Sequence, residues 1–451
     1  MLGVTEMDEQ FVKMTKTPVP KLVAQLAVPT VISMLITSIY NLADAYFVGG
    51  IGTSASGAIG IVLGLQTLIQ SFGFMFGQGA GSLASRRLGS KENDAASRIA
   101  CEGFAMSLIV GVIFAVLGFI FFTPMLKLLG STDTILPYAR DYCQYILLAA
   151  PFFASSCVLN NVMRYEGHAS LAMIGLTTGA ILNIVLDPIF IYGLNMGVGG
   201  AGLATALSQL VSFCILFYMF ISGRTQIKIS LRALKWRIED VKEICATGFP
   251  TLLRQGLTSI STMALNNCAG VYGDAAVAAM SIVGRVCWLM ASVMVGIGQG
   301  MQPVAAYNHG AKKYSRVKEA YIFTIKLGEI VMIIFAAAMF LVSAQIIGVF
   351  RDDPEVIAIG VTALRLQCAA MLFQPLTVAS NMVFQSIGES RLAALIAMLR
   401  SGICFLPVVF ILPMFCGIFG VQCAQTVADA LSFVIALPFA IHYMRNIPKD
   451  A

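Results

Sequence analysis

Long apolar stretches separated by short polar segments run through the whole chain. A helix needs about 20 mostly apolar residues to span a bilayer, and twelve stretches are long enough. Gly and Pro interrupt several of them, which membrane helices tolerate better than soluble helices do. The pattern predicts twelve transmembrane helices, near residues 24–49, 57–85, 99–123, 138–159, 167–193, 198–221, 245–272, 275–306, 319–345, 357–385, 393–415 and 420–443.

The composition also favours a membrane protein. The chain is 58% hydrophobic and only 12% charged, whereas soluble domains carry about 25% charged residues. The eleven cysteines form no CxxC pair and mostly lie in apolar stretches. They are therefore interpreted as small packing residues, which argues against a disulfide framework or a metal site.

The two halves of the chain are similar in sequence. Residues 29–91 align with residues 250–312 without a gap, and 20 of the 63 positions are identical. A duplicated, strongly apolar chain is typical of a secondary transporter. We call this alignment, which places Pro29 on Pro250, the repeat register. Further pairs that it aligns include Gly77/Gly298, Gly79/Gly300, Asn160/Asn381 and Gly167/Gly388.

The repeat predicts an all-α integral membrane protein with two pseudo-symmetric lobes. Six spans per half is an even number, so both halves enter the membrane with the same polarity and are related by an axis along the membrane normal. We expect an N-lobe of residues 1–221, a basic linker of residues 222–244 and a C-lobe of residues 245–451. Two six-helix lobes of this kind would surround a central cavity.

The basic residues predict the orientation in the membrane. Of the 29 Lys and Arg residues, 21 fall on one side of the predicted spans, 4 on the other side and 4 within spans. The positive-inside rule makes the richer side cytoplasmic, so we expect both termini there. Residues 1–21 mix charges of both signs and contain no apolar core, so no signal peptide is expected. This bias explains the net charge of +6 without a nucleic-acid partner.

Two carboxylates in the N-terminal half lie within predicted spans. Ionisable residues cost roughly 3 kcal/mol or more inside a membrane and are functional candidates by default. Asp44 is in the first span and Asp187 in the fifth, where Asn183 precedes it by one helical turn on the same face. Thr205 of the sixth span adds a hydroxyl. The four side chains could form a pocket of oxygen ligands, or merely a buried pair that satisfies hydrogen bonds.

The repeat serves as an internal control for these acids. Asp44 aligns with Leu265, and Asp187 falls near Leu406 and Val408. Because the C-terminal half is built without either acid, the fold alone does not require them. Tyr40 lies one turn before Asp44 and can face the same cavity.

The C-terminal half carries other charges within its spans. Glu329 and Asp429 are acidic, and Arg254 and Arg285 are basic. We expect these arginines to pair with the two acids and to support packing rather than ion movement.

Several motifs, in order and duplicated, resemble the multidrug and toxic compound extrusion (MATE) transporters over essentially the whole chain, with closest similarity to Gram-positive bacterial members. These motifs are Asn41-Leu42-Ala43-Asp44, Gly77-Gln78-Gly79-Ala80-Gly81, Asn183-Ile184-Val185-Leu186-Asp187-Pro188 and Gly200-Ala201-Gly202-Leu203-Ala204-Thr205.

The resemblance implies an antiporter that exports organic cations and drug-like compounds in exchange for H⁺ or Na⁺. It implies an ion site at Asp44, Asn183, Asp187 and Thr205, a substrate site that includes Tyr40, Asp44 and Asn160, and a bend at Pro29. No cofactor and no metal beyond Na⁺ are expected. A monomer in a bacterial plasma membrane would suffice, since one pseudo-symmetric chain already encloses a cavity.

The chain departs from one branch of that family. This branch has an acidic residue in the seventh span, eight residues after the proline, as part of a C-lobe Na⁺ site. Here that position is Thr258, and the tenth span has no acid between Ala358 and Ile387. The sequence therefore favours the N-lobe site.

Two other functions are considered. A lipid-linked-sugar flippase of the same superfamily is expected to hold pyrophosphate with cationic cavity residues, for which Arg254 and Arg285 are candidates. A membrane enzyme or receptor is disfavoured, because the chain has no HExxH, no GxSxG and almost no mass outside its spans. We expect no enzymatic activity.

Overall fold

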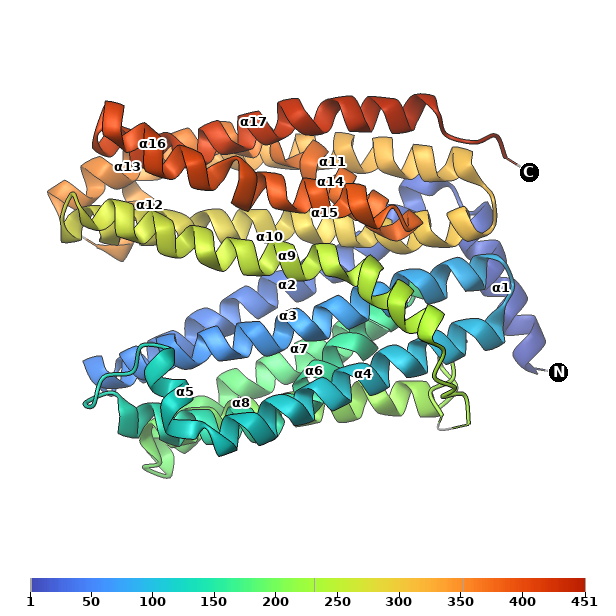
Figure 1. The fold of residues 1–451 in the computed structure, drawn as a ribbon, viewed down its shortest axis with the longest axis horizontal. Helices are drawn as coiled ribbons and strands as arrows, with labels where there is room; N and C mark the ends of the chain where they lie inside the picture. The colour runs from blue at the N-terminus through green and yellow to red at the C-terminus, as the bar shows by residue number, and fades with distance from the viewer. Residues whose placement is uncertain (1, 231, 352, 451) are drawn as a thin grey trace. The chain divides into compact units, whose positions relative to one another are not determined.

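The structure is a computed structural model that describes residues 2–230, 232–351 and 353–450. The described residues form helices and connecting segments, with no strand among them (Figure 1). The all-helical prediction is therefore confirmed. The N-terminal half contains α1 (Leu2–Lys16), α2 (Val19–Gly49), α3 (Thr53–Gly89), α4 (Asn93–Ile120), α5 (Phe122–Leu128), α6 (Leu136–Tyr165), α7 (Ala169–Pro188), the π-helical turn η1 (Ile189–Gly193) and α8 (Gly197–Ile221).

The C-terminal half repeats this order of long helices. It contains α9 (Ile238–Gly270), α10 (Asp274–Gly310), α11 (Tyr314–Leu341), α12 (Ser343–Phe350), α13 (Pro354–Met371), α14 (Gln374–Ile387), α15 (Ser390–Met398), the π-helical turn η2 (Leu399–Ile403), α16 (Phe405–Cys416) and α17 (Ile418–Arg445). Among the described residues, 11 helical segments are long and apolar enough to cross a membrane. The remaining predicted span, the seventh (residues 245–272), corresponds to α9, which has 33 residues but is more polar than the others.

The helices depart from the predicted spans in places where the backbone is interrupted. The predicted tenth span is divided into α13 and α14, because Pro375 lies in the first turn of α14 and cannot donate a hydrogen bond to the preceding turn. The eleventh is divided by the π-helical turn η2. The sequence pattern also gave no indication of α1, which precedes the first span.

The chain forms two compact units that do not follow the midpoint of the sequence. One unit contains residues 1–11 and 32–248, and the other contains residues 12–31 and 249–451. The helices α2 and α9, the first long helix of each half, therefore each start in the unit formed mainly by the other half. The helix α2 changes unit just after Pro29, and α9 changes unit just before Pro250.

The repeated Gly-Gln-Gly runs explain this exchange of helix starts. A Cβ atom at Gly79 would lie 2.1 Å from the carbonyl oxygen of Ile244 in α9. A Cβ atom at the equivalent Gly300 would lie 2.5 Å from the Cα atom of Ala27 in α2. Only glycine permits such close approach of two helix backbones. The sequence repeat is thus matched by a repeated helix crossing, one within each unit.

A polar contact is repeated as well. Asn160 Nδ2 donates to the carbonyl oxygen of Ala172 over 2.9 Å, and Asn381 Nδ2 donates to that of Ala393 over 2.7 Å. The repeat register places Asn160 on Asn381 and Ala172 on Ala393. The bond ties α6 to α7 in one half and α14 to α15 in the other, so this asparagine has a packing role in each unit.

The linker between the halves is held against the first unit. Glu166 Oε1 accepts hydrogen bonds from the backbone N–H groups of Gln226 and Ile227. Further along, Glu102 Oε1 accepts from the N–H of Arg237 over 3.2 Å. Glu166 directly follows α6 and Glu102 lies within α4, so the linker is attached to two helices of the first unit.

The burial of Glu166 predicts a pH effect on stability. Its side chain is fully buried, and burial raises its pKa to about 8, although the two backbone N–H donors lower it. The neutral form is therefore favoured in the folded state. The stability that this form contributes is fully present below the unfolded-state value near 4.5 and is lost as the pH rises through about 8.

The prediction concerns the melting temperature of the purified protein as a function of pH. Between about pH 6 and pH 9 we expect the wild type to lose several degrees more than Glu166→Gln, which keeps an acceptor for the linker but cannot ionise. The exposed Asp141→Asn variant serves as the control and should follow the wild type. Parallel curves for wild type and Glu166→Gln would refute this role of Glu166.

Candidate functional site

The four predicted ion ligands lie on three helices of the first unit. Asp44 is in the last part of α2, Asn183 and Asp187 are in the last turns of α7, and Thr205 is in α8. Their exposed fractions are 5%, 1%, 0% and 3% respectively. Pro188 ends α7 directly after Asp187, and the π-helical turn η1 follows. Such turns often accompany functional sites, because they shift the direction of the side chains beside them.

Hydrogen bonds connect two of these four residues and bring in a fifth. Asn183 Nδ2 donates to Thr205 Oγ1 over 3.2 Å. Tyr142 of α6 donates its hydroxyl to Asp44 Oδ2 over 3.4 Å. Tyr142 is fully buried and also lies against Thr205. The asparagine, the threonine and the tyrosine therefore link the two acid-bearing helices.

Four buried oxygen atoms of this group have no hydrogen-bond partner among the described residues. They are Asp44 Oδ1, Asn183 Oδ1 and both carboxylate oxygens of Asp187. A buried carboxylate without a donor is costly when it is ionised. Either a proton or a bound cation would relieve that cost, so the residues present can accommodate the predicted H⁺ or Na⁺.

The two carboxylates also interact electrostatically. Asp44 on α2 and Asp187 on α7 both belong to this one buried group. Two negative charges repel each other strongly in a medium of low dielectric constant. Binding of one proton or one cation therefore stabilises the pair of carboxylates relative to the state in which both are ionised.

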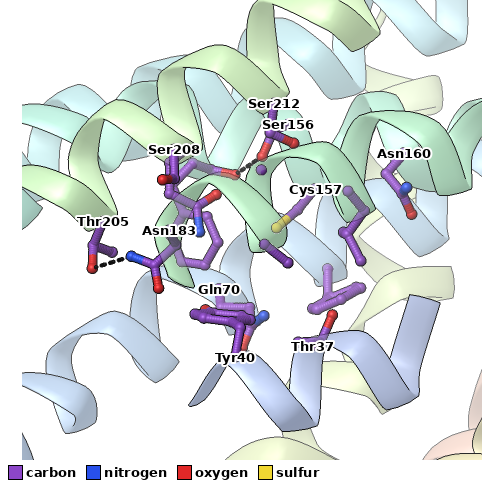
Figure 2. Close-up of a pocket in the computed structure, with 16 residues that line it drawn as sticks. Thr37, Tyr40, Gln70, Ser156, Cys157, Asn160, Asn183, Thr205, Ser208 and Ser212 are labelled. Atoms are coloured by element: carbon purple, nitrogen blue, oxygen red, sulfur yellow. Dashed lines mark hydrogen bonds between the residues drawn. The ribbon is translucent and has the colours of Figure 1, made fainter. Parts of the chain in front are cut away.

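A cavity lies beside this group within the first unit. It contains about 600 Å³ of space including its open mouth, and its wall includes Asn183 and Thr205. Figure 2 shows the hydrogen-bonded Asn183 and Thr205 on one side and Tyr40 and Thr37 of α2 on another. The cavity wall thus shares two side chains with the predicted ion site.

Only some of the predicted site residues line this cavity. Tyr40 and Asn160 both line the cavity. Asp44 and Asp187 are not among the residues that line it, so their connection to the cavity runs through Asn183 and Thr205. Pro29 lies within the continuous helix α2, two residues before the change of unit.

Tyr142 is the site residue that the sequence reasoning missed. A tyrosine in an apolar span gives little signal by itself, since it is common in membrane-protein interiors and at interfaces. The repeat contained a usable signal, because its register aligns Tyr142 with Ala363. Like Asp44, it is therefore a polar group that only one half possesses.

The charges of the C-terminal half do not pair as expected. Asp429 is 2% exposed and forms an ion pair with Arg400, whose Nε lies 3.0 Å from Asp429 Oδ1. Arg254 instead donates to Asn381 Oδ1 over 3.4 Å, and Arg285 is exposed. The expectation that Arg254 or Arg285 neutralises Asp429 was therefore wrong, because Arg400 on η2 forms that ion pair.

Together, the duplicated helical fold and a buried acidic site beside a cavity define a membrane transport protein. The MatE family model matches residues 29–189 and residues 250–411, one match in each half of the chain. The chain belongs to the MatE family. It is accordingly a transporter and not an enzyme.

The chain is similar over nearly its full length to proteins of this kind. It is 27% identical to the Multidrug export protein MepA of Staphylococcus aureus (strain NCTC 8325 / PS 47) over 431 residues, which cover 95% of each chain. A crystal structure of a MATE protein in the straight conformation matches 96% of this chain and 98% of its own, with a TM-score of 0.92 and 26% identity.

A further match is to an outward-facing multidrug resistance MATE family transporter, with a TM-score of 0.92 and 26% identity. It covers 97% of this chain and 98% of the other. These matches confirm the predicted class, an all-α membrane transporter of the MATE fold.

Proposed function

We propose that the protein exports cationic and amphipathic drug-like compounds by exchange for H⁺ or Na⁺, and that Asp44, Asn183, Asp187 and Thr205 bind the ion. The observation that carries this proposal is the set of four buried oxygen atoms without a hydrogen-bond partner among the described residues. The names of the relatives, which include a multidrug export protein, support the class of substrate.

In this proposal the ion and the drug exclude each other through shared residues. An organic cation in the cavity meets Tyr40 and Asn160 and is stabilised by negative charge on the nearby carboxylates. Uptake of H⁺ or Na⁺ at Asp44 and Asp187 removes that charge and weakens binding of the drug. Because Asn183 and Thr205 belong both to the cavity wall and to the ion group, occupation of one site alters the other.

The conformational change between the drug-bound and the ion-bound state would occur within α2 and α9, the two helices that each belong partly to one unit and partly to the other. The linker is attached to the first unit through Glu166 and Glu102, so it is a poor flexing point. We instead expect α2 to flex after Pro29 and α9 to flex around Pro250, where a proline removes one backbone hydrogen bond from each helix.

Dye efflux from reconstituted vesicles tests the proposed function. A pH gradient and a Na⁺ gradient are imposed one at a time, and export of a fluorescent organic cation is recorded. We expect one of the two gradients, acting across a tight membrane, to drive export. Export that neither gradient accelerates, by a protein that still binds the dye, would exclude antiport.

The proposed topology places both termini in the cytoplasm of a bacterial cell. A cysteine at the exposed Lys235 should react with a membrane-impermeant maleimide only after the cells are opened, and one at Met196 should react in intact cells. The unmodified chain, which retains the exposed Cys214 and Cys416, gives the background. The reverse labelling pattern would overturn the proposed orientation.

A lipid-linked-sugar flippase gains no support from the two arginines that suggested it. Arg254 is engaged with Asn381, and Arg285 is exposed on the helix α10. We therefore propose small organic cations as the substrates of this protein, which lies in a lipid bilayer. A monomer is the expected functional unit, with no cofactor.

A further inference from the structure

The second unit contains a buried polar cluster that the proposed ion site does not use. Asp429 Oδ1 accepts hydrogen bonds from Arg400 Nε over 3.0 Å and from Gln425 Nε2 over 2.8 Å. Asp429 Oδ2 accepts from Gln374 Nε2 over 3.4 Å. Three residues, from α14, η2 and α17, thus meet around the carboxylate of Asp429. We refer to Gln374, Arg400, Gln425 and Asp429 as the Arg400 cluster.

Asp429 fixes the direction of the Arg400 side chain. The ion pair uses only the Nε atom of the guanidinium, and no hydrogen bond joins either terminal amino group to the rest of the described chain. The Arg400 side chain is 31% exposed, whereas that of Asp429 is 2% exposed. The guanidinium is therefore fixed through its Nε atom, and its two terminal amino groups can donate to another acceptor.

A second atom of the cluster also has unused capacity. Gln374 is 3% exposed, and its Oε1 atom has no partner in the described part of the chain. A buried amide oxygen without a donor is costly, and a ligand or a water molecule would supply one. Packing alone would not require both a free acceptor and free guanidinium donors in the same place.

The repeat relates this cluster to the cavity of the first unit. The repeat register is a shift of 221 residues, and a shift of 220 residues aligns α8 with α17. This offset register places Gln425 on Thr205 and Asp429 on Gln209. The original register, which the shared asparagine bond supports, places Gln374 on Phe153. Identical pairs in the offset register include Gly200/Gly420, Ala204/Ala424, Ser212/Ser432 and Phe213/Phe433.

Every member of the Arg400 cluster therefore corresponds to a residue of the cavity wall. Phe153, Thr205 and Gln209 all line the cavity of the first unit. Arg400 falls on Gly179 or Ala180, according to which register is applied, and both of these line the cavity too. The second unit thus has a cationic group where the first unit has small residues.

We propose that Arg400 binds the carboxylate of zwitterionic drug-like molecules, with Asp429 as the residue that positions it. A guanidinium presents parallel donors that match the two oxygens of a carboxylate. The charges of Arg400 and Asp429 sum to zero, so the cluster suits a group with one negative charge rather than a pyrophosphate. The inference goes beyond the proposed export of cations and does not depend on the ion site of the first unit.

The test compares two forms of one rhodamine dye, the free acid and its methyl ester, which differ in the carboxylate alone. Their dissociation constants are measured by fluorescence polarisation on the purified protein in lipid nanodiscs, without any ion gradient. We expect Arg400→Gln to weaken binding of the free acid about tenfold and to change binding of the ester less than about twofold. Arg400→Lys, which keeps the charge without the fork, should give an intermediate result.

Removal of Arg400 alone leaves Asp429 buried without its counter-ion, which can prevent folding. The double variant Arg400→Gln/Asp429→Asn contains no unpaired charge and should show the same selective loss of the free acid. Equal weakening of both dyes in the folded double variant would assign the cluster to packing. Unchanged binding of the free acid, or no binding of it by the wild type, would also refute the proposal. None of these outcomes bears on ion coupling, because no gradient is applied.

Discussion

The variants Asp44→Asn and Asp187→Asn are each expected to reduce gradient-driven export of an organic cation at least tenfold while the protein still folds. Asparagine is nearly the same size as aspartate but can neither take up a proton nor attract a cation. Both carboxylates are buried, and Asp44 Oδ1 and both oxygens of Asp187 have no hydrogen-bond partner among the described residues, so neutralisation of either acid should not destabilise the fold. Initial rates of dye efflux from proteoliposomes give the measurement.

The control for this prediction is an acidic residue outside the buried group. Asp141 is exposed near the start of α6, and Asp141→Asn should export the dye at the wild-type rate. The melting temperature of each purified variant shows that loss of export is not loss of folding. Near wild-type export by either Asp44→Asn or Asp187→Asn would exclude that residue from ion coupling.

The substitution Gly248→Ala is expected to cause the largest loss of stability among single-methyl changes in α9. A Cβ atom at this position would lie 1.9 Å from the carbonyl oxygen of Met75 and 2.7 Å from its carbonyl carbon, both in α3. Because these are backbone atoms, no side-chain rotation can relieve the contact. The helices must separate, at a cost of about 1–3 kcal/mol or more.

The same helix offers a matched control. Gly256 also lies in α9, and an added Cβ atom there would meet nothing within 4 Å. Gly256→Ala should leave the melting temperature unchanged or raise it, since alanine favours a helix by about 0.5–1 kcal/mol over glycine. Similar melting temperatures for the two variants would show that α3 and α9 do not cross as closely as described.

The fold could be predicted from the sequence because two strong signals agreed. Long apolar stretches indicate membrane helices by their length alone, and the ungapped repeat of residues 29–91 on 250–312 supported the same two-span pattern at the start of each half. The exchange of helix starts between units was not predictable in this way. It depends on contacts between segments far apart in the sequence, such as that between Gly79 and Ile244, which no local pattern encodes.

The candidate site was accessible to sequence reasoning only where chemistry was unusual. Asp44 and Asp187 stand out because carboxylates are rare in apolar spans. Tyr142 and Arg400 did not stand out, because a tyrosine is ordinary in such a span and the partner of Asp429 depends on the π-helical turn that carries Arg400. It stays a prediction that the side chains of Asp44, Asn183, Asp187 and Thr205 bind the coupling ion.

The central claim is that ion coupling belongs to Asp44 and Asp187 rather than to the acid of the second unit. The most direct test records ion uptake and dye efflux together in proteoliposomes that contain the wild type, Asp187→Asn or Asp429→Asn. We predict that Asp187→Asn loses coupled uptake of H⁺ or Na⁺, whereas Asp429→Asn retains it, even if its preference among dyes changes. Coupling that survives Asp187→Asn but fails in Asp429→Asn would place the ion site in the second unit and contradict the account.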